Sequence, residues 1–394
     1  MSGAGASPPT RPRTRLTGAG WIFCALAAIL TIGAIRVQVP LLYLLVGGMF
    51  GSLLASVLLG RRMVRYIDLQ REAPSRVWQN QTVHVGYYLR NTRRGACLGL
   101  TLCEQVGPAV RSARGYLACL GSRQAARAGG RFRASHRGQL VLGEVEVSSD
   151  FPFALTRSRR RIDRPLELLV WPSRGHLKRP LLHRGAVEVS TSAPSPVGGG
   201  SDDFFGLRDY RGGDNPRWIH WRRSAGRNVP VMREMSRPVP ELLYVLLDTR
   251  ADPADLSGLQ RLERMIRFTA TLVDYAISRD YQVGLALGDH GGPVIVPAQP
   301  GRGQLHKLLD CLALAQAGSH GLEQVVAGLH RGQLRYAQVV LVSGTDELSA
   351  AVWIPLRKTC RHLTLVRPST LGLLFDDSPA PADPASTRRG AVRE

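Results

Sequence analysis

Two long uncharged stretches dominate the first sixty residues of the chain. Leu16–Ile35 and Val37–Gly60 contain no charged side chain, and only Arg36 separates them. A helix needs about 20 mostly apolar residues to cross a bilayer. The pattern therefore predicts two transmembrane helices within residues 16–60, joined by a loop too short to hold a domain. A cleaved signal peptide is less favoured, because a second apolar stretch follows the first at once.

Arginines flank this helical hairpin at both of its ends. Those before the first stretch are Arg11, Arg13 and Arg15, and those after the second are Arg61, Arg62 and Arg65. Basic residues concentrate on the cytoplasmic side of membrane proteins, so both ends are predicted to be cytoplasmic. We expect a two-pass protein of the inner (plasma) membrane, with a basic cytoplasmic N-terminus at residues 1–15 and with its soluble domains and both termini in the cytoplasm.

Short runs of alternating apolar residues follow the second stretch. Two of the clearest are Val83–Leu89 and Gln139–Val147, and turn signals separate the runs. A period of two is typical of strands with one buried face, so residues 66–175 are predicted to form a small all-β sandwich. Phe151 and Phe153 are predicted to anchor its core.

The pattern changes again after residue 240. Leu242–Leu247 is a continuous apolar run, as in a strand buried on both faces of a parallel sheet. Between Leu259 and Ile277 apolar residues recur every three or four positions, as on one face of a long helix. Together with a hairpin turn at Gly288–Gly292, this order of elements predicts an α/β domain over residues 240–375.

Two segments have the composition of flexible chain. Residues 186–200 are rich in Ser, Pro and Gly and are predicted to be a linker. Residues 376–394 are rich in Pro and Ala and are predicted to be disordered. The expected protein is therefore multi-domain, with a transmembrane helical hairpin, a small all-β sandwich and an α/β domain.

The segment 201–239 differs from ordinary core or linker sequence. Arginines, acids, two tryptophans and a histidine lie among glycine and proline turn signals. It resembles the signature of the bacterial "domain of unknown function 58" family, roughly Phe-x-Gly-Leu-Arg-x-Tyr, then Gly-Asp-x-x-Arg-x-Ile-x-Trp, then Ser-Ala-Arg. The matching residues are Phe205, Gly206, Leu207, Arg208, Tyr210, Gly213, Asp214, Arg217, Ile219, Trp221, Ser224 and Ala225. Gly226 stands where the family usually has Arg, and Ala154 stands in place of Gly in a second, shorter family turn.

This resemblance implies a membrane-anchored protein whose α/β domain is von Willebrand factor A-like, a Rossmann-like fold. It also implies two partners, a MoxR-type AAA+ ATPase and a transglutaminase-like membrane protein. The expected function is a membrane-tethered cytosolic adaptor or assembly factor that acts with the ATPase, without enzymatic activity. Trp and Arg are favoured interface anchors, and the candidate partner-binding or signature residues are Phe205, Gly206, Leu207, Arg208, Tyr210, Arg211, Gly213, Asp214, Arg217, Ile219, His220, Trp221 and Ser224.

The residues of the signature also allow a local structural prediction. Asp214 or Asn215 can cap a helix, with Pro216 in its first turn. Trp218 and Trp221 cannot both share one face with the neighbouring isoleucine, so at least one aromatic side chain is expected at a surface.

Two other roles remain open for this segment. One is a salt-bridged clasp between the β-sandwich and the α/β domain. The other is a metal-dependent or hydrolytic enzyme that uses Asp202, Asp203, Asp214 or His220, although no Ser or Cys lies in a recognised nucleophile motif.

Asp248 is a weak candidate for a metal ligand. It follows the apolar run 242–247, and ligands of α/β sheets bind at the carboxyl ends of strands. In metal-binding members of the A-type fold this position opens an Asp-x-Ser-x-Ser motif, but here Arg250 stands where the first serine would be. A guanidinium cannot ligate a cation, so we predict no metal at this position and an ion pair between Arg250 and Asp248 in its place.

The charge of the chain narrows the range of partners. The formal net charge is +22, and nearly all of the 52 basic residues are arginine. Basic residues beside a bilayer gain about 1 kcal/mol each from anionic lipid, so membrane lipid is an expected partner. No known nucleic-acid-binding module is present, and nucleic acid is not expected as a partner. The chain has no P-loop, HExxH motif or GxGxxG after a strand, and its six cysteines have no metal spacing, so no cofactor is expected.

Overall fold

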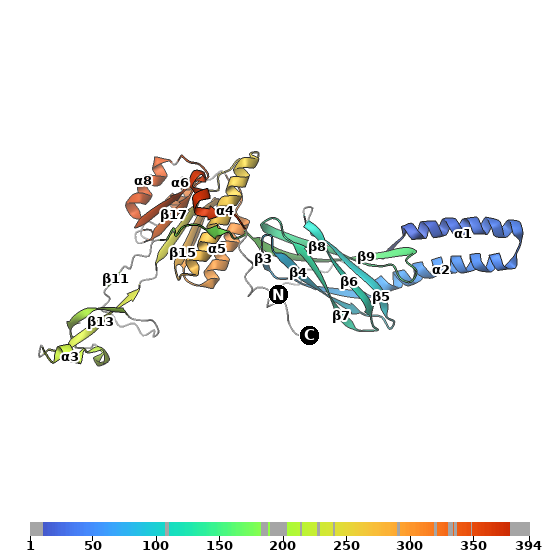
Figure 1. Ribbon diagram of the computed structural model, residues 1–394, viewed down its shortest axis with the longest axis horizontal. Coiled ribbons are helices and arrows are strands. Elements are labelled where there is room, and N and C mark those ends of the chain that lie inside the picture. The colour runs from blue at the N-terminus through green and yellow to red at the C-terminus, as the bar shows by residue number, and fades with distance from the viewer. Residues whose placement is uncertain are drawn as a thin grey trace. The chain divides into compact units, whose positions relative to one another are not determined.

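A computed structural model describes residues 11–106, 110–182, 188–189, 203–212, 215–226, 229–238, 241–289, 292–318, 321–329, 334, 337–347 and 349–378. The chain divides into two compact units. The first comprises Met1–Arg174, Leu309–Ala315 and Pro379–Glu394, and the second comprises Gly175–Leu308 and Gln316–Ser378. Figure 1 labels their helices and strands.

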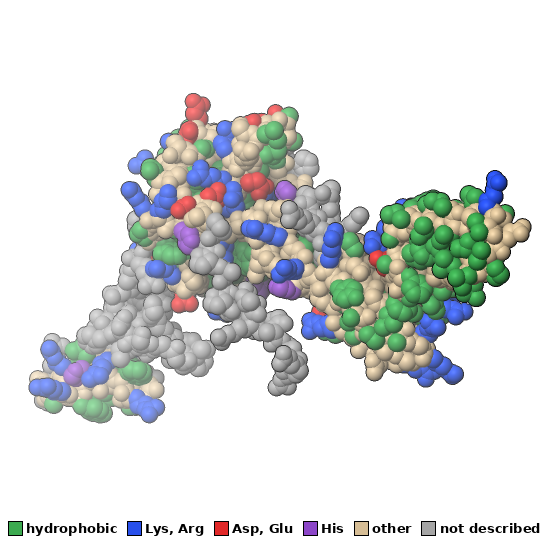
Figure 2. All heavy atoms as spheres, turned by 45° about the vertical axis from the view of Figure 1, so that its right-hand side comes forward, with side chains coloured by type: hydrophobic (Ala, Val, Ile, Leu, Met, Phe, Trp, Pro, Cys, Tyr) green, Lys and Arg blue, Asp and Glu red, His purple; other side chains and the backbone are tan. Residues whose placement is uncertain are grey.

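Two long apolar helices begin the first unit. They are α1 (Gly18–Val37) and α2 (Pro40–Arg65), each with a mean hydropathy of 2.1 over its most apolar window. Both are long and apolar enough to cross a membrane, and many of their large apolar side chains are exposed; Figure 2 shows hydrophobic side chains gathered over this part of the molecule, at its right. Thr17 caps α1, since its Oγ1 accepts a hydrogen bond from the Gly20 amide at 3.0 Å. These features suggest a membrane anchor.

The C-terminal end of α2 is held by an arginine from a distant strand. The last carbonyl groups of a helix have no partner within the helix. Arg160 Nη1 donates to the carbonyl oxygens of Val64 (3.2 Å), Arg65 (2.7 Å) and Ile67 (2.9 Å). The chain thus passes from the second apolar helix into the strand that begins at Ile67 through a capped junction.

Two sheets make up the β-rich body of the first unit. One has the order β1-β9-β8-β5-β6, with β3 also paired to β9, and the other has the order β2-β4-β7. A single apolar cluster, which includes Leu69 and Leu89 of the smaller sheet and Leu100 and Val147 of the larger, lies between them. The strands are β1 (Arg13–Leu16), β2 (Ile67–Glu72), β3 (Arg76–Trp78), β4 (Thr82–Asn91), β5 (Cys97–Val106), β6 (Val110–Leu120), β7 (Ala125–Arg133), β8 (Gly138–Ser149) and β9 (Thr156–Trp171).

Two features of this body differ from the sequence prediction. Phe151 packs against the apolar cluster as predicted, but Phe153 is 57% exposed and anchors nothing. Residues of the predicted basic N-terminus form β1, which pairs with β9. The partner strand lies about 140 residues later in the chain, so the residues around Arg13 carry no local pattern that predicts this pairing. Ala154 has a φ of 55°, a left-handed conformation that glycine adopts most easily. This conformation gives a physical reason for the glycine that the shorter family turn has at this position.

A charged cluster lies inside the β-rich body. Glu104 of β5 is fully buried, and the Tyr87 hydroxyl of β4 donates to its Oε2 at 2.6 Å. Arg71 of β2 forms an ion pair with the same carboxylate, and its side chain is 2% exposed. Arg71 Nη2 also donates to the carbonyl oxygens of Leu142 (3.1 Å) and Gly143 (3.2 Å) of β8. The cluster therefore ties the two sheets together, and burial raises the pKa of Tyr87 to about 12.

The second unit contains a five-stranded sheet of order β16-β15-β14-β17-β18. β14 is parallel to β15 and β17, β17 is parallel to β18, and β15 and β16 form the predicted antiparallel hairpin. The strands are β14 (Leu242–Leu247), β15 (Gln282–Asp289), β16 (Gly292–Gln299), β17 (Gln338–Val342) and β18 (His362–Val366). The helices are α4 (Leu256–Ile277), α5 (Arg302–Leu314), whose residues from Leu309 on belong to the first unit, α6 (Leu322–Gly328), α8 (Ala350–Thr359) and α9 (Pro368–Leu374).

Helices cover both faces of this sheet. Alternate residues of a strand point to opposite faces, and Tyr244 and Leu246 share an apolar cluster with residues of α6 and α8. The long helix α4 packs on β14 and β15 and buries the apolar face that its periodicity predicts. The helix α8, which contains Pro355, was not predicted because a proline inside a helix interrupts the local signal.

A separate small sheet joins β11 (Glu188–Val189), β13 (Val231–Pro238) and β12 (Asp203–Asp209) in that order. β12 and β13 are antiparallel, and their register shifts between Phe204 and Gly206. Another short pair, β10 (His176–Leu177) and β19 (Phe375–Asp376), brings the two ends of the second unit together. The predicted linker 186–200 and tail 376–394 lie mostly outside the described residues.

We expect loss of Glu104 to destabilise the first unit strongly. The substitution Glu104→Ala leaves Arg71 buried without its partner, which costs about 3–5 kcal/mol in comparable buried pairs. The midpoint of urea-dependent pulse proteolysis, measured on the full-length protein in detergent micelles, should fall accordingly. Glu144→Ala is the matched control, because Glu144 pairs with Arg161 at 3.5 Å while 53% exposed and should cost less than about 1 kcal/mol. Equal midpoints for the two variants would contradict a structural role for the cluster.

Candidate functional site

The signature residues that the structure describes lie along the hairpin formed by β12 and β13. Between these strands the chain forms a short 3-10 helix, η1 (Pro216–Trp218), and a single helical turn, α3 (Trp221–Ser224). Asn215 caps η1, since its Oδ1 accepts a hydrogen bond from the Arg217 amide at 3.2 Å, and Pro216 occupies the first position. The predicted cap is therefore present at Asn215, on a helix much shorter than an ordinary α-helix.

Ser224 and His220 attach the loop between β12 and β13 to β13. The Ser224 Oγ accepts from the Val231 amide at 2.8 Å and donates to the His220 carbonyl at 3.1 Å. The His220 amide donates to the Val231 carbonyl at 2.7 Å, and its ring Nδ1 accepts from the Arg223 amide at 3.3 Å. The hydroxyl proton of Ser224 thus points to a backbone oxygen and not to the imidazole, so the two side chains support the loop and do not form a nucleophile–base pair.

Exposed aromatic and cationic side chains gather on this loop and on the neighbouring end of β12. Trp221 is 69% exposed and Trp218 37%, and Leu207 of β12 is 38% exposed. Among the described residues between 207 and 233 there are six arginines and one acid, Asp209. We call the following exposed set the hairpin surface: Leu207, Arg211, Arg217, Trp218, Trp221, Arg222 and Arg223. Figure 2 shows arginines and apolar side chains together on this part of the molecule, at its lower left.

The other predicted residues are found in β12 and in the chain between β12 and β13, where the structure describes them. Phe205 and Gly206 lie in β12, at the shift in register. Arg208 is half-buried and donates from Nη1 to the Asp209 carbonyl at 3.3 Å, and the Tyr210 amide donates to the Pro230 carbonyl at 2.8 Å. Ile219 forms an isolated bridge with Met232. Gly213, Asp214 and Asp202 lie outside the described residues, as does the side chain of Asp203.

Two exposed arginines were missed by the sequence analysis. Arg222 and Arg223 directly follow Trp221 on α3 and are exposed. The sequence held a signal for them, because they directly follow a tryptophan that was a candidate for the surface. Two charged residues beside an exposed aromatic residue are expected to be exposed as well.

A second group of polar residues lies at the carboxyl ends of β14 and β17. Asp248 is 2% exposed, and Arg250 Nε and Nη2 lie 3.3 and 3.2 Å from its Oδ1 and Oδ2. This fork is the ion pair expected from the sequence, and the bond to Asp248 raises the pKa of the Arg250 guanidinium. After β17, Ser343 Oγ donates to the Thr345 carbonyl at 2.9 Å, and Asp346 Oδ1 accepts from Ser369 Oγ at 2.7 Å.

These residues do not fit a divalent cation. Both oxygens of Asp248 are bound by a fixed guanidinium, and the carboxylate of Asp346 is bound by a serine on another loop. Within the described part of the chain, no group of three or more His, Cys, Asp or Glu side chains is placed to hold a metal ion.

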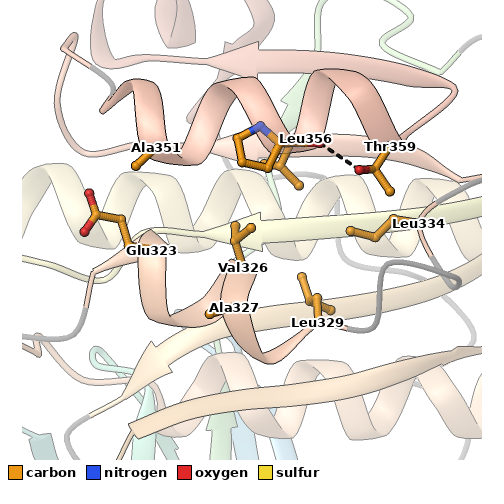
Figure 3. A pocket seen from close by; sticks show the side chains of 9 residues that line it. Glu323, Val326, Ala327, Leu329, Leu334, Ala351, Leu356 and Thr359 are labelled. Atoms are coloured by element: carbon orange, nitrogen blue, oxygen red, sulfur yellow. Dashed lines mark hydrogen bonds between the residues drawn. The ribbon is translucent and has the colours of Figure 1, made fainter.

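A groove of about 230 Å³ lies between α6 and α8 (Figure 3). Its lining is mainly apolar, and Figure 3 shows Glu323 at one end and Thr359 at the other. The Thr359 hydroxyl donates to the Pro355 carbonyl at 2.8 Å. Among the lining residues that the structure describes there are one carboxylate and one committed hydroxyl, and these are not the paired groups of acid–base or nucleophilic catalysis.

Comparison with known proteins supports the family indicated by the signature. A family model described as "Protein of unknown function DUF58" matches residues 206–367, from β12 to the end of β18. No match was found among curated proteins.

Similarity to solved structures is slight. The CARDB domain of PF1109 from Pyrococcus furiosus is 8% identical over 27% of this chain and 94% of that domain, with a TM-score of 0.20. Cwp6 from Clostridium difficile is 7% identical over 76% of this chain and 37% of that one, with a TM-score of 0.20. The alkylpurine DNA glycosylase AlkC from Pseudomonas fluorescens, bound to DNA with an abasic site analog, is 12% identical over 30% and 35%, with a TM-score of 0.18. Scores this low support no conclusion about function.

Removal of the Ser224 hydroxyl should destabilise the loop between β12 and β13, which carries most of the hairpin surface. Ser224→Ala loses two hydrogen bonds to backbone groups, and each is worth about 1 kcal/mol. Hydrogen–deuterium exchange of the full-length protein in detergent should speed up at least about fivefold in peptides that contain Val231. Ser278→Ala is the control, since Ser278 is an exposed serine that donates to the Tyr275 carbonyl at 2.7 Å on α4. Unchanged exchange in Ser224→Ala would show that the hydroxyl does not hold the loop.

Proposed function

We propose that this protein is a membrane-tethered cytosolic adaptor or assembly factor that acts with a MoxR-type AAA+ ATPase. In this proposal α1 and α2 anchor the chain in a bacterial inner membrane, and the hairpin surface binds the ATPase. A transglutaminase-like membrane protein is a further proposed partner. The signature and the family match support this assignment, because proteins that resemble this chain are associated with such partners.

The observation that carries the proposal is the exposure of Trp221. A tryptophan that is 69% exposed keeps a large apolar area in water, although burial would stabilise it by a few kcal/mol. Trp221 lies among exposed arginines on a turn held to β13 by the Ser224 hydroxyl and the His220 amide, so its position is preorganised. Trp and Arg in such an arrangement are the residues that most often dominate binding energy at protein interfaces.

The α/β domain is proposed to have the von Willebrand factor A-like arrangement. The strand order β16-β15-β14-β17-β18, with only β16 antiparallel, is the order expected of that fold. In this proposal the ATPase acts on, or through, this domain, and the hairpin surface is an insertion before its first strand.

The proposed topology has both ends of the helical hairpin in the cytoplasm. A Val39→Cys variant tests it, because Val39 lies between α1 and α2 and is 40% exposed. In intact cells a membrane-impermeant maleimide should label Val39→Cys and leave the wild-type protein unlabelled. The exposed Cys119 of the β-rich body should react only after permeabilisation. Labelling of the wild-type protein in intact cells would place the body on the opposite side and contradict the proposal.

The partner assignment is tested by affinity purification of the full-length protein from detergent, followed by mass spectrometry. An AAA+ ATPase should copurify with the wild-type protein. Recovery should fall at least about tenfold with Trp221→Ala, because interface anchors of this type contribute about 2 kcal/mol or more, and should also fall with Arg217→Ala.

Two variants serve as matched controls for this purification. Tyr116→Ala removes an aromatic side chain that is 65% exposed on β6, and Arg131→Ala removes an exposed arginine on β7. Both should retain the ATPase. Recovery of no ATPase with the wild-type protein, or equal recovery with all variants, would contradict the proposed contact and favour a search for enzymatic activity.

A further inference from the structure

The carboxyl edge of the central strand β14 carries a buried carboxylate that is rigidly placed. Asp248 follows β14 directly, and its backbone amide donates to the Val342 carbonyl of β17 at 2.8 Å. The residue is 2% exposed. Ligands of α/β sheets bind at this edge, so the state of this carboxylate decides what the edge can bind.

The partner of this carboxylate comes from its own loop. Arg250 contributes its backbone amide to Asp248 Oδ1 at 3.1 Å, in addition to the fork of Nε and Nη2. A bidentate guanidinium is a strong and geometrically specific partner for a carboxylate. It also compensates the charge of Asp248, which would be costly to bury alone. The pair is therefore complete without a metal ion.

Only part of the Arg250 guanidinium is used in this pair. Its side chain is 49% exposed, and no hydrogen bond joins Nη1 to any described residue. Nη1 lies beside Gly321, where an added Cβ would come within 3.2 Å of it. The carboxylate of Glu323 also acts electrostatically on Arg250, and the hydroxyl of Ser343 is committed to the Thr345 carbonyl.

We propose that the Asp248–Arg250 pair is a metal-independent carboxylate-binding site, in which Arg250 does what a divalent cation would do at this edge of the sheet. Asp248 orients the guanidinium, and the remaining N–H groups of Arg250 meet the incoming carboxylate. The ligand is an acidic side chain of a protein or a free carboxylate, which share this chemistry. The site is separate from the hairpin surface and does not require the AAA+ partner.

The first experiment tests the replacement of the metal. Binding of Mn²⁺ to the full-length protein in detergent is measured by electron paramagnetic resonance. The wild-type protein should bind no Mn²⁺ at millimolar concentration. The double variant Arg250→Ser, Asp252→Ser restores both serines of the Asp-x-Ser-x-Ser pattern and should gain one Mn²⁺, which a further Asp248→Asn substitution should abolish.

Two results would decide this experiment against the proposal. Stoichiometric Mn²⁺ on the wild-type protein, lost with Asp248→Asn, would overturn the proposal, and so would a folded double variant that binds no Mn²⁺. Arg261→Ser is the control, because Arg261 pairs with Asp255 at 3.4 Å in an exposed position on α4. It should bind no more Mn²⁺ than the wild-type protein.

The second experiment tests the carboxylate directly. Saturation-transfer NMR with acetate should give a signal with the wild-type protein and with Arg261→Gln. The signal should fall at least about tenfold with Arg250→Gln, which keeps much of the side chain's length and polarity but removes its charge. An equal signal for Arg250→Gln would overturn the proposal, and it does so even if the double variant fails to fold.

A second probe distinguishes the two sources of the carboxylate. N-acetylaspartate N-methylamide presents the same group in a peptide context. Binding at least about tenfold tighter than that of acetate would identify an acidic protein side chain as the ligand. Binding equal to that of acetate would identify a free carboxylate.

Discussion

Buried backbone and carboxylate groups need hydrogen-bond partners, and in this protein arginine often supplies them. An orphaned polar group in the interior costs about as much as a lost hydrogen bond. Arg160 caps the last carbonyls of α2, and Arg71 bonds two carbonyls of β8 together with the carboxylate of Glu104. Arg250 does the same for Asp248 at the edge of the second sheet. Part of the large positive charge of the chain is therefore structural and does not face a partner.

The exposed arginines of the hairpin surface differ from these structural arginines. Arg217, Arg222 and Arg223 are exposed beside Trp221. The turn that carries them is held by Ser224 and by the backbone of His220, neither of which uses a guanidinium. Arginine thus occurs in two settings. In the hairpin surface it is exposed beside an aromatic side chain, and at Asp248 it is a half-exposed cation held by a buried carboxylate.

Elements with a strong local period could be predicted from the sequence. The two apolar stretches, the continuous run 242–247 and the periodic helix after Leu256 all appear in the structure, because burial of a face imposes its period on the residues. Asn215 as a cap and Arg250 as the partner of Asp248 were also predictable, since each acts within two residues of its target. Helix α8, with an internal proline, and strand β1, in a basic segment, were not predictable in this way.

The sequence by itself determined which segments are apolar on one face, on both faces or along their whole length, and which short-range caps and ion pairs can form. Only the tertiary structure decided that Glu104 meets Arg71 and Tyr87, that Phe153 is exposed while Phe151 is buried, and that Ser224 holds Val231. The physical reason is the distance along the chain over which each interaction acts. A period or a cap depends on neighbouring residues, whereas pairing of strands brings together residues whose contact leaves no local pattern in either segment.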